Sequence, residues 1–254
     1  MKNKEIIRCE KMSISFGGIK AVSGISLRLD QGQVVGIMGP NGAGKTTVFN
    51  LLTGVYGPTS GKIYVEGKDM AGKTMDQFVK AGVARTFQNI RLFENMTVLE
   101  NIMAAVANKG DIQVNKCLLR TKKYIKRQND IRSEALDLLK LFGLQGKGHI
   151  LAGNLPYGQQ RQLEIVRAIA TGARAILLDE PAAGMNPTET IKLKCDIRDM
   201  VHRFGIGVML IEHHMDLVMD LCDYIYVLDF GKVICEGRPR EVQRDSKVIS
   251  AYLG

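Results

Sequence analysis

The sequence lacks any long apolar run. A membrane-spanning helix needs about 18 or more consecutive, mainly apolar residues, and no stretch of these 254 residues approaches that length. The opening residues lead into a short apolar patch that Arg8 and Glu10 interrupt, so they do not resemble a secretory signal. We therefore expect no transmembrane segment and a protein that stays inside the cell.

Cysteines are few and scattered. They are odd in number and include no CxxC pair, whereas zinc sites and disulfide frameworks depend on close pairs or even sets. Reduced thiols in a reducing compartment are the expectation. The five cysteines are Cys9, Cys117, Cys195, Cys222 and Cys235.

What is present is the composition of a globular α/β protein. Hydrophobic residues make up 45% of the chain and charged residues 24%. Strand-like and helix-like runs alternate in the C-terminal part, which favours a mostly parallel sheet covered on both faces. Between residues 89 and 157 the pattern becomes helical. We interpret residues 89–157 as a helical subdomain inserted between two core segments, residues 1–88 and 158–254. Expected strands are 6–9, 12–16, 25–29, 33–38, 62–65, 175–178, 207–211, 224–228 and 233–235.

A glycine-rich loop joins the expected strand 33–38 to a helix that begins near Lys45. The loop, Gly39-Pro40-Asn41-Gly42-Ala43-Gly44-Lys45-Thr46, fits G-x-x-x-x-G-K-[ST]. Its glycines let several N–H groups point at one anion, and the helix adds its positive dipole end. Lys45 is expected to reach the β- and γ-phosphates, and Thr46 to bind Mg²⁺. We predict a P-loop nucleoside triphosphatase whose nucleotide site also includes Thr47.

The apolar strand 175–178 ends in two acids, Asp179 and Glu180. Asp179 is placed to hold Mg²⁺ through water, and Glu180 to polarise the attacking water as a general base. For acids at a strand end taken alone, capping of the next helix is an equally good interpretation. The P-loop upstream favours the catalytic one.

Two histidines follow the strand 207–211. His213 and His214 are expected at the sheet edge that carries Asp179, where doubly wound folds bind ligands. Spacing alone does not decide which of the two reaches the γ-phosphate.

Five motifs in order resemble those of the ATP-binding cassette (ABC) proteins, over essentially the whole chain. The resemblance implies an α/β fold: a P-loop NTPase core with an N-terminal antiparallel β subdomain and an inserted helical subdomain. Besides the P-loop, the motifs are Arg-Thr-Phe-Gln at 85–88 (the Q-loop), Leu-Pro-Tyr-Gly-Gln-Gln at 155–160 (the LSGGQ signature), Pro-Ala-Ala-Gly-Met-Asn at 181–186 (the D-loop) and Ile-Glu-His at 211–213 (the switch-histidine strand).

The resemblance implies roles that the residues alone do not. Phe16 stands where the family stacks an aromatic ring on adenine, Gln88 where it contacts Mg²⁺ and water, and His213 is the switch residue. Gly158 and Gln159 of the signature would bind ATP from a second cassette subunit in a head-to-tail dimer. The other partners implied are transmembrane permease subunits, which would hold the chain at the cytoplasmic face of the membrane as a peripheral subunit.

Three positions depart from the family pattern. Pro156 replaces the signature serine and offers neither a hydroxyl nor an N–H, and such a lost hydrogen bond is worth about 1–3 kcal/mol. The Gly158 N–H and the helix start remain available for a phosphate. Tyr157 stands where many members have glycine. The D-loop ends in Asn186 instead of aspartate, which weakens its usual contact across the dimer.

Within the family, the residues at 157–165, 179–187, 211–216 and 251–254 resemble the LivG-like ATPases of branched-chain amino acid importers. This implies an ATPase whose closure on ATP drives a transport step through separate permeases. The alternative is a soluble assembly ATPase of the iron–sulfur cluster type, whose signature is usually more standard. Cassettes that act on nucleic acid or ribosomes carry a second cassette or a long coiled-coil insert, and this chain has neither.

The net charge is +9, and the segment 116–132 carries seven basic residues against one acid, Asp130. A solvated helix face is the favoured interpretation, and contact with anionic lipid or an acidic permease loop is the alternative. Tyr124 is the single aromatic residue in the segment, so nucleic acid is not expected as a partner.

Overall fold

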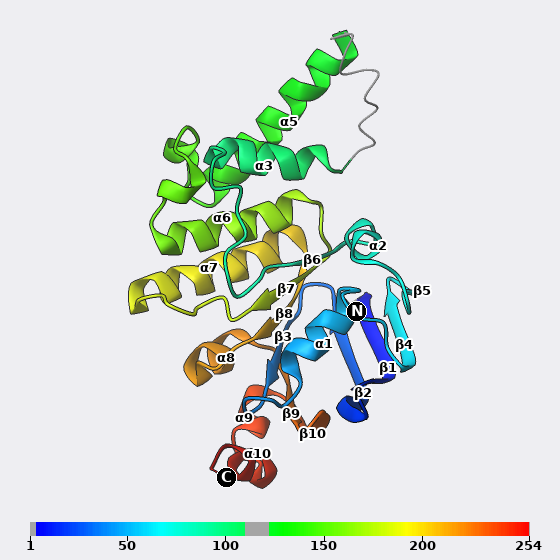
Figure 1. Cartoon of the computed structure of the whole chain (residues 1–254). Coiled ribbons are helices and arrows are strands. Elements are labelled where there is room, and N and C mark those ends of the chain that lie inside the picture. The colour runs from blue at the N-terminus through cyan, green and yellow to red at the C-terminus, as the bar shows by residue number, and fades with distance from the viewer. Residues whose placement is uncertain (1–3, 110–121, 254) are drawn as a thin grey trace. The chain divides into compact units, whose positions relative to one another are not determined.

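The computed structural model describes residues 4–109 and 122–253, and the chain divides into two compact units. The first, unit 1, consists of the chain up to Gln88 and from Arg174 onward. Unit 2 runs from Asn89 to Ala173, whereas the sequence placed its end at 157. The difference arises because helix α6 (Tyr157–Ala170) packs against α3 (Val98–Ala107) of the same unit (Figure 1).

Unit 1 begins with a four-stranded antiparallel sheet in the order β2-β1-β4-β5. The prediction of two separate strands at 6–9 and 12–16 is wrong, because β1 continues through both. Its register shifts between Cys9 and Met12, where Lys11 adopts a positive φ of 47°, so an irregularity in one strand replaces a turn. The strands are β1 (Glu5–Phe16), β2 (Ile19–Asp30), β4 (Ser60–Val65) and β5 (Lys68–Asp69).

The second sheet of unit 1 has six strands in the order β10-β9-β3-β8-β7-β6, and all but β10 run parallel. Every residue of β3, β7 and β8 is buried, as expected for a sheet covered on both faces. The strands are β3 (Val34–Met38), β6 (Val83–Arg85), β7 (Ala175–Asp179), β8 (Gly207–Ile211), β9 (Tyr224–Asp229) and β10 (Lys232–Gly237).

Helix α1 (Lys45–Leu52) ties the two sheets together. Its apolar side chains, among them Val48, Phe49 and Leu52, are fully buried in one cluster with residues of both sheets. Because α1 follows directly from the loop after β3, this packing fixes the loop at the carboxyl edge of the parallel sheet (Figure 1). The other helices of unit 1 are α2 (Met75–Lys80), α7 (Pro187–Phe204), α8 (Met215–Leu221), α9 (Pro239–Val242) and α10 (Ser246–Leu253).

Unit 2 is helical in the part of the chain that the structure describes. Helices α3, α5 (Lys122–Leu141) and α6 pack on one another, with short 3₁₀ turns η1 (Gln145–Lys147) and η2 (Ala152–Asn154). Of the basic segment, residues 116–121 lie outside the described residues, as does Cys117. Across 4–109 and 122–253, no helix is both long enough and apolar enough to cross a membrane.

Asn186 has a local role that the motif comparison did not suggest. It is the N-cap of α7: its side chain accepts a hydrogen bond from the Glu189 N–H at 3.0 Å, and the Glu189 carboxylate accepts one from the Asn186 N–H at 3.0 Å. This reciprocal arrangement satisfies two backbone donors at the start of the helix.

Replacing this cap tests the local account. Asn186→Ala should lower the free energy of unfolding by about 1 kcal/mol, and Asn186→Asp should keep it within about 0.5 kcal/mol, because aspartate caps as well as asparagine. Urea denaturation followed by circular dichroism measures both. Equal losses in the two variants would contradict the capping role.

Candidate functional site

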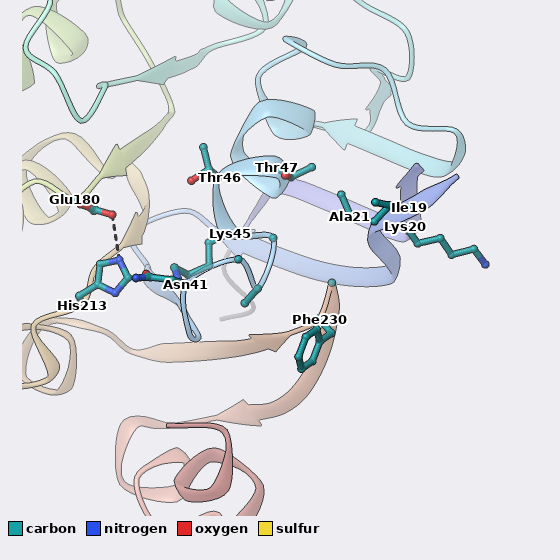
Figure 2. A pocket seen from close by; sticks show the side chains of 14 residues that line it. Ile19, Lys20, Ala21, Asn41, Lys45, Thr46, Thr47, Glu180, His213 and Phe230 are labelled. Carbon is teal, nitrogen blue, oxygen red and sulfur yellow. Dashed lines mark hydrogen bonds and ion pairs between the residues drawn. The ribbon is translucent and has the colours of Figure 1, made fainter. Parts of the chain in front are cut away.

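A pocket of about 420 Å³ opens at the carboxyl edge of the parallel sheet in unit 1. That volume lies within the range of small-molecule sites. Figure 2 shows the loop after β3 along one wall, with Glu180 and His213 facing it and Phe230 at the rim. The lining residues are Ile19, Lys20, Ala21, Asn41, Gly42, Ala43, Gly44, Lys45, Thr46, Thr47, Glu180, His213, Phe230 and Gly231.

At two positions the loop requires glycine, because the backbone has a positive φ and a Cβ would clash with a neighbouring carbonyl oxygen. Gly39 has a φ of +143°, and a Cβ there would lie 2.1 Å from the Leu228 carbonyl oxygen of β9. Gly44, the residue before α1, has a φ of +99°, and its Cβ would lie 2.7 Å from the Ala21 carbonyl oxygen. The loop is therefore pressed against β9 and β2, with its backbone facing the pocket in front of the helix start.

Lys45 is buried and folded over its own loop. Its Nζ donates to the carbonyl oxygens of Gly39 at 2.7 Å and Pro40 at 2.9 Å. Burial lowers the pKa of the ammonium, while the carboxylates of Glu180 and Asp179 act in the opposite direction. A cation held this way is available to an anion that enters the pocket.

Asp179, at the end of β7, is held by an arginine that the sequence analysis did not select. Arg85 of β6 donates to the Asp179 carboxylate at 2.6 Å and to the Asn50 side chain of α1 at 2.7 Å. Both charged side chains are less than a tenth exposed. The pairing depends on β6 lying beside β7, and a three-residue strand leaves little trace in a sequence.

Glu180 adopts a left-handed backbone with φ of 46°, which is uncommon for any residue except glycine. One carboxylate oxygen lies 3.1 Å from His213 Nε2 (Figure 2), and the other accepts a hydrogen bond from the Gln88 side chain at 2.9 Å. The structure thus distinguishes the two histidines, since His213 contacts Glu180 and His214 contacts Glu212.

Comparison with known proteins shows the family and the fold. A family model described as ABC transporter matches residues 22–183, and one described as branched-chain amino acid ATP-binding cassette transporter matches residues 232–254. The chain belongs to the ABC transporter family. It is therefore an ABC ATPase, and the α/β cassette fold predicted from the sequence is confirmed.

Individual relatives match this ABC cassette over nearly its full length. It is 40% identical over 252 residues to the Pseudomonas aeruginosa protein named high-affinity branched-chain amino acid transport ATP-binding protein BraF, covering 99% of both chains. Identity and coverage are the same for LivG of Salmonella typhimurium, which carries the same description. A solved nucleotide-free ATP-binding cassette from an ABC transporter superposes with a TM-score of 0.85 at 34% identity, covering 98% of this chain and 99% of that one.

The structure of this ABC cassette gathers some of the expected site residues and leaves others apart. Residues 41–47, Glu180 and His213 line the pocket. Gly39 and Pro40 are not among the lining residues, and their carbonyl oxygens accept from Lys45. Asp179 pairs with Arg85, and Gln88 donates to Glu180. Phe16 lies outside the lining and packs edge-to-face on Tyr56, with ring centroids 5.2 Å apart.

Gly158 and Gln159 belong to unit 2, at the start of α6. The Gln159 side chain accepts a hydrogen bond from Lys147, and α6 begins at Tyr157 with Pro156 as its N-cap residue. Proline fits this place because its missing N–H is not needed at a helix start.

Sequence reasoning missed part of the pocket wall. The Ile19–Ala21 segment and the Phe230-Gly231 turn meet there, and Gly231 donates to the Ala43 carbonyl at 3.0 Å and accepts from the Ser23 N–H at 2.8 Å. Phe230 is 85% exposed and has a φ of 40°. In the sequence, the only sign of this wall is an aromatic residue directly before a glycine, Phe230-Gly231. The Tyr252 hydroxyl of α10 accepts from the Gly39 N–H at 2.9 Å, a contact across 213 residues that no local pattern reveals.

The Arg85–Asp179 pair predicts a large effect on stability. Arg85→Met should lower the free energy of unfolding by about 3–5 kcal/mol, because it leaves a carboxylate buried without its cation. Arg174→Met is the matched control, since Arg174 pairs with Glu66 while 57% exposed, and should cost about 0–1 kcal/mol. Urea unfolding of both variants measures the difference, and similar losses would contradict the importance of burial.

Proposed function

We propose that this chain is the ATP-hydrolysing subunit of a branched-chain amino acid importer and that the pocket in unit 1 is its catalytic site. The observation that carries the catalytic part is the position of Glu180. Its carboxylate faces the phosphate-binding loop across the pocket and is oriented by His213 on one oxygen and Gln88 on the other (Figure 2).

The loop binds the phosphates of ATP. Its backbone N–H groups and the start of α1 supply positive potential, and Lys45 exchanges its carbonyl contacts for the β- and γ-phosphates. Phe16 is half exposed at the end of β1 and is proposed to stack on the adenine ring. Gly158 and Gln159 are proposed to contact the γ-phosphate bound to a second cassette subunit.

The side chains around the pocket also fit a magnesium ion. The Thr46 hydroxyl lines the pocket, and Asp179 and Gln88 supply oxygen atoms of the kind that Mg²⁺ prefers. When bound, Mg²⁺ would neutralise charge on the β- and γ-phosphates. Within the described residues, no three His, Cys, Asp or Glu side chains form a metal-binding group.

Hydrolysis follows from the same geometry. Glu180 accepts a proton from a water molecule while the oxygen of that water bonds to the γ-phosphorus. The bond between the γ-phosphorus and the oxygen that bridges it to ADP breaks at the same time, and ADP leaves. His213 contacts the Glu180 carboxylate and lines the pocket, and we propose that it also contacts the γ-phosphate. Products are ADP and inorganic phosphate.

The importer role is supported by the relatives. Proteins 40% identical over 99% of this chain are named for high-affinity branched-chain amino acid transport, and the matching C-terminal model carries the same description. Described residues include no membrane-spanning helix. The proposed importer also contains separate permease subunits and a second cassette. We place the chain at the cytoplasmic face of the membrane through those partners. The similarity does not favour the iron–sulfur assembly alternative.

Glu180→Gln tests the catalytic assignment. The amide keeps the shape of the side chain but cannot accept the proton, so the ATP turnover rate should fall by about 100-fold or more. Nucleotide affinity should stay near the wild-type value, and ATP with Mg²⁺ should accumulate a dimer. Phosphate release and size-exclusion chromatography measure these outcomes. Near-normal turnover would remove Glu180 from the role of base.

Transport in cells tests the importer role. Lys45→Ala removes the cation that binds the phosphates, so cells carrying this variant in place of the native chain should lose high-affinity uptake of labelled leucine, isoleucine and valine. Lys62→Ala is the control and should retain uptake, because Lys62 is exposed on β4 and does not line the pocket. Unchanged branched-chain amino acid uptake in the Lys45→Ala cells would refute the proposed solute.

A further inference from the structure

We propose that Glu212 is a positioning residue for hydrolysis, whose buried carboxylate joins the turn after Glu180 to the turn that carries His213. This inference rests on the proposed roles of Glu180 and His213. No motif assigned Glu212 a function of its own, since the sequence analysis considered only the histidines beside it.

The contacts of Glu212 span two segments that are far apart in the sequence. One carboxylate oxygen accepts a hydrogen bond from the Ala182 N–H at 2.8 Å. The other accepts from the His213 N–H at 3.0 Å and lies 3.2 Å from His214 Nδ1. The side chain is only 2% exposed, so these bonds form in an environment from which water is largely excluded.

Glu212 is the first residue after β8, at the point where the pairing of β7 and β8 ends. Strands β7 and β8 pair in register as far as Asp179 and Ile211, and the Glu180 N–H still donates to the Ile211 carbonyl at 2.9 Å. Beyond that point the segments that follow β7 and β8 form separate turns. The Glu212 carboxylate therefore takes over from the backbone ladder in holding them together.

The result is a closed ring of contacts around the catalytic pair. Ala182 lies two residues after Glu180, and its N–H donates to the Glu212 carboxylate. His213 follows Glu212 in the sequence, and its ring contacts Glu180 at 3.1 Å, which closes the ring. Glu180 also holds a left-handed φ of 46°, and such a backbone persists only where its surroundings over-determine it. The Ala182 bond is one such restraint.

A carboxylate suits this place better than any neutral side chain. Both of its oxygens accept, and hydrogen bonds from N–H groups to a charged acceptor are stronger than neutral ones. An amide in its place would turn an NH₂ group toward either Ala182 or His213, which are both donors, and one of the two segments would be released.

The test compares Glu212→Gln with Glu212→Asp, Glu180→Gln and the exposed control Glu236→Gln. We expect Glu212→Gln to lower kcat for ATP by about 10- to 100-fold while KM and the affinity for a fluorescent ATP analogue stay within about threefold, because misplacement affects the reacting groups and not the phosphate loop. Glu212→Asp keeps the charge and both acceptors and should recover part of kcat. Glu236→Gln should match the native protein.

Each outcome decides between the claims. Normal kcat in Glu212→Gln, with Glu180→Gln inactive, overturns the role of Glu212 and leaves the proposed function intact. Equal loss of nucleotide affinity and kcat means that Glu212 is only structural and also overturns the inference. If Glu212→Gln does not fold, Glu212→Asp is compared with the native protein instead, because its shorter side chain cannot hold both turns in their native positions. A kcat equal to the native value then contradicts the proposal. Normal turnover in Glu180→Gln instead refutes the proposed function itself.

Discussion

The parallel pairing of β3, β8 and β7 is the constraint on which the rest of the site depends. In-register pairing places Ile37, the last residue but one of β3, beside Ile211, and Ile211 beside Asp179, which are the last residues of β8 and β7. The segments that continue from them, namely the phosphate loop, the turn with His213 and the turn with Glu180, then have to emerge at one edge. Chemistry encoded in three distant parts of the chain is brought together by hydrogen bonds that carry no sequence preference of their own.

The turns at that edge are held by interactions that tolerate little change. Gly39 fits against the Leu228 carbonyl only because it has no side chain, and Asp179 is held by Arg85 with both charges buried. Glu180 is kept in a rare backbone conformation between the β-ladder and the Glu212 carboxylate. The core around α1 provides the rigid support, since its apolar face packs against both sheets.

Much of this could be predicted from the sequence where the information is local. The phosphate loop is a continuous run of residues with a fixed glycine pattern, and Asp179 and Glu180 follow an obviously apolar strand. Spacing alone could not decide between His213 and His214, and only the family resemblance implied His213, because the choice depends on which ring turns toward Glu180 once β7 and β8 are paired. The irregularity at Lys11 was read as a strand break, since a bulge and a turn look alike in a short polar interruption.

Other features were beyond prediction because they depend on strand order or long-range packing. Arg85 acquires its role from a three-residue strand beside β7, and Tyr252 reaches Gly39 from the far end of the chain. The extent of unit 2 to Ala173 follows from the packing of α6 on α3, whereas the helical sequence pattern suggested a boundary at 157. In each case the residue type was visible in the sequence and its partner was not.

The most direct test of the account is to identify what the chain assembles with. A tagged Glu180→Gln chain, purified in mild detergent with ATP from the cells that make it, should bring down two hydrophobic permease subunits and a second ABC cassette, as identified by mass spectrometry. That result would establish the importer motor, and the permeases would indicate the solute. Recovery of soluble proteins alone, such as components of cluster assembly, would contradict the transport role.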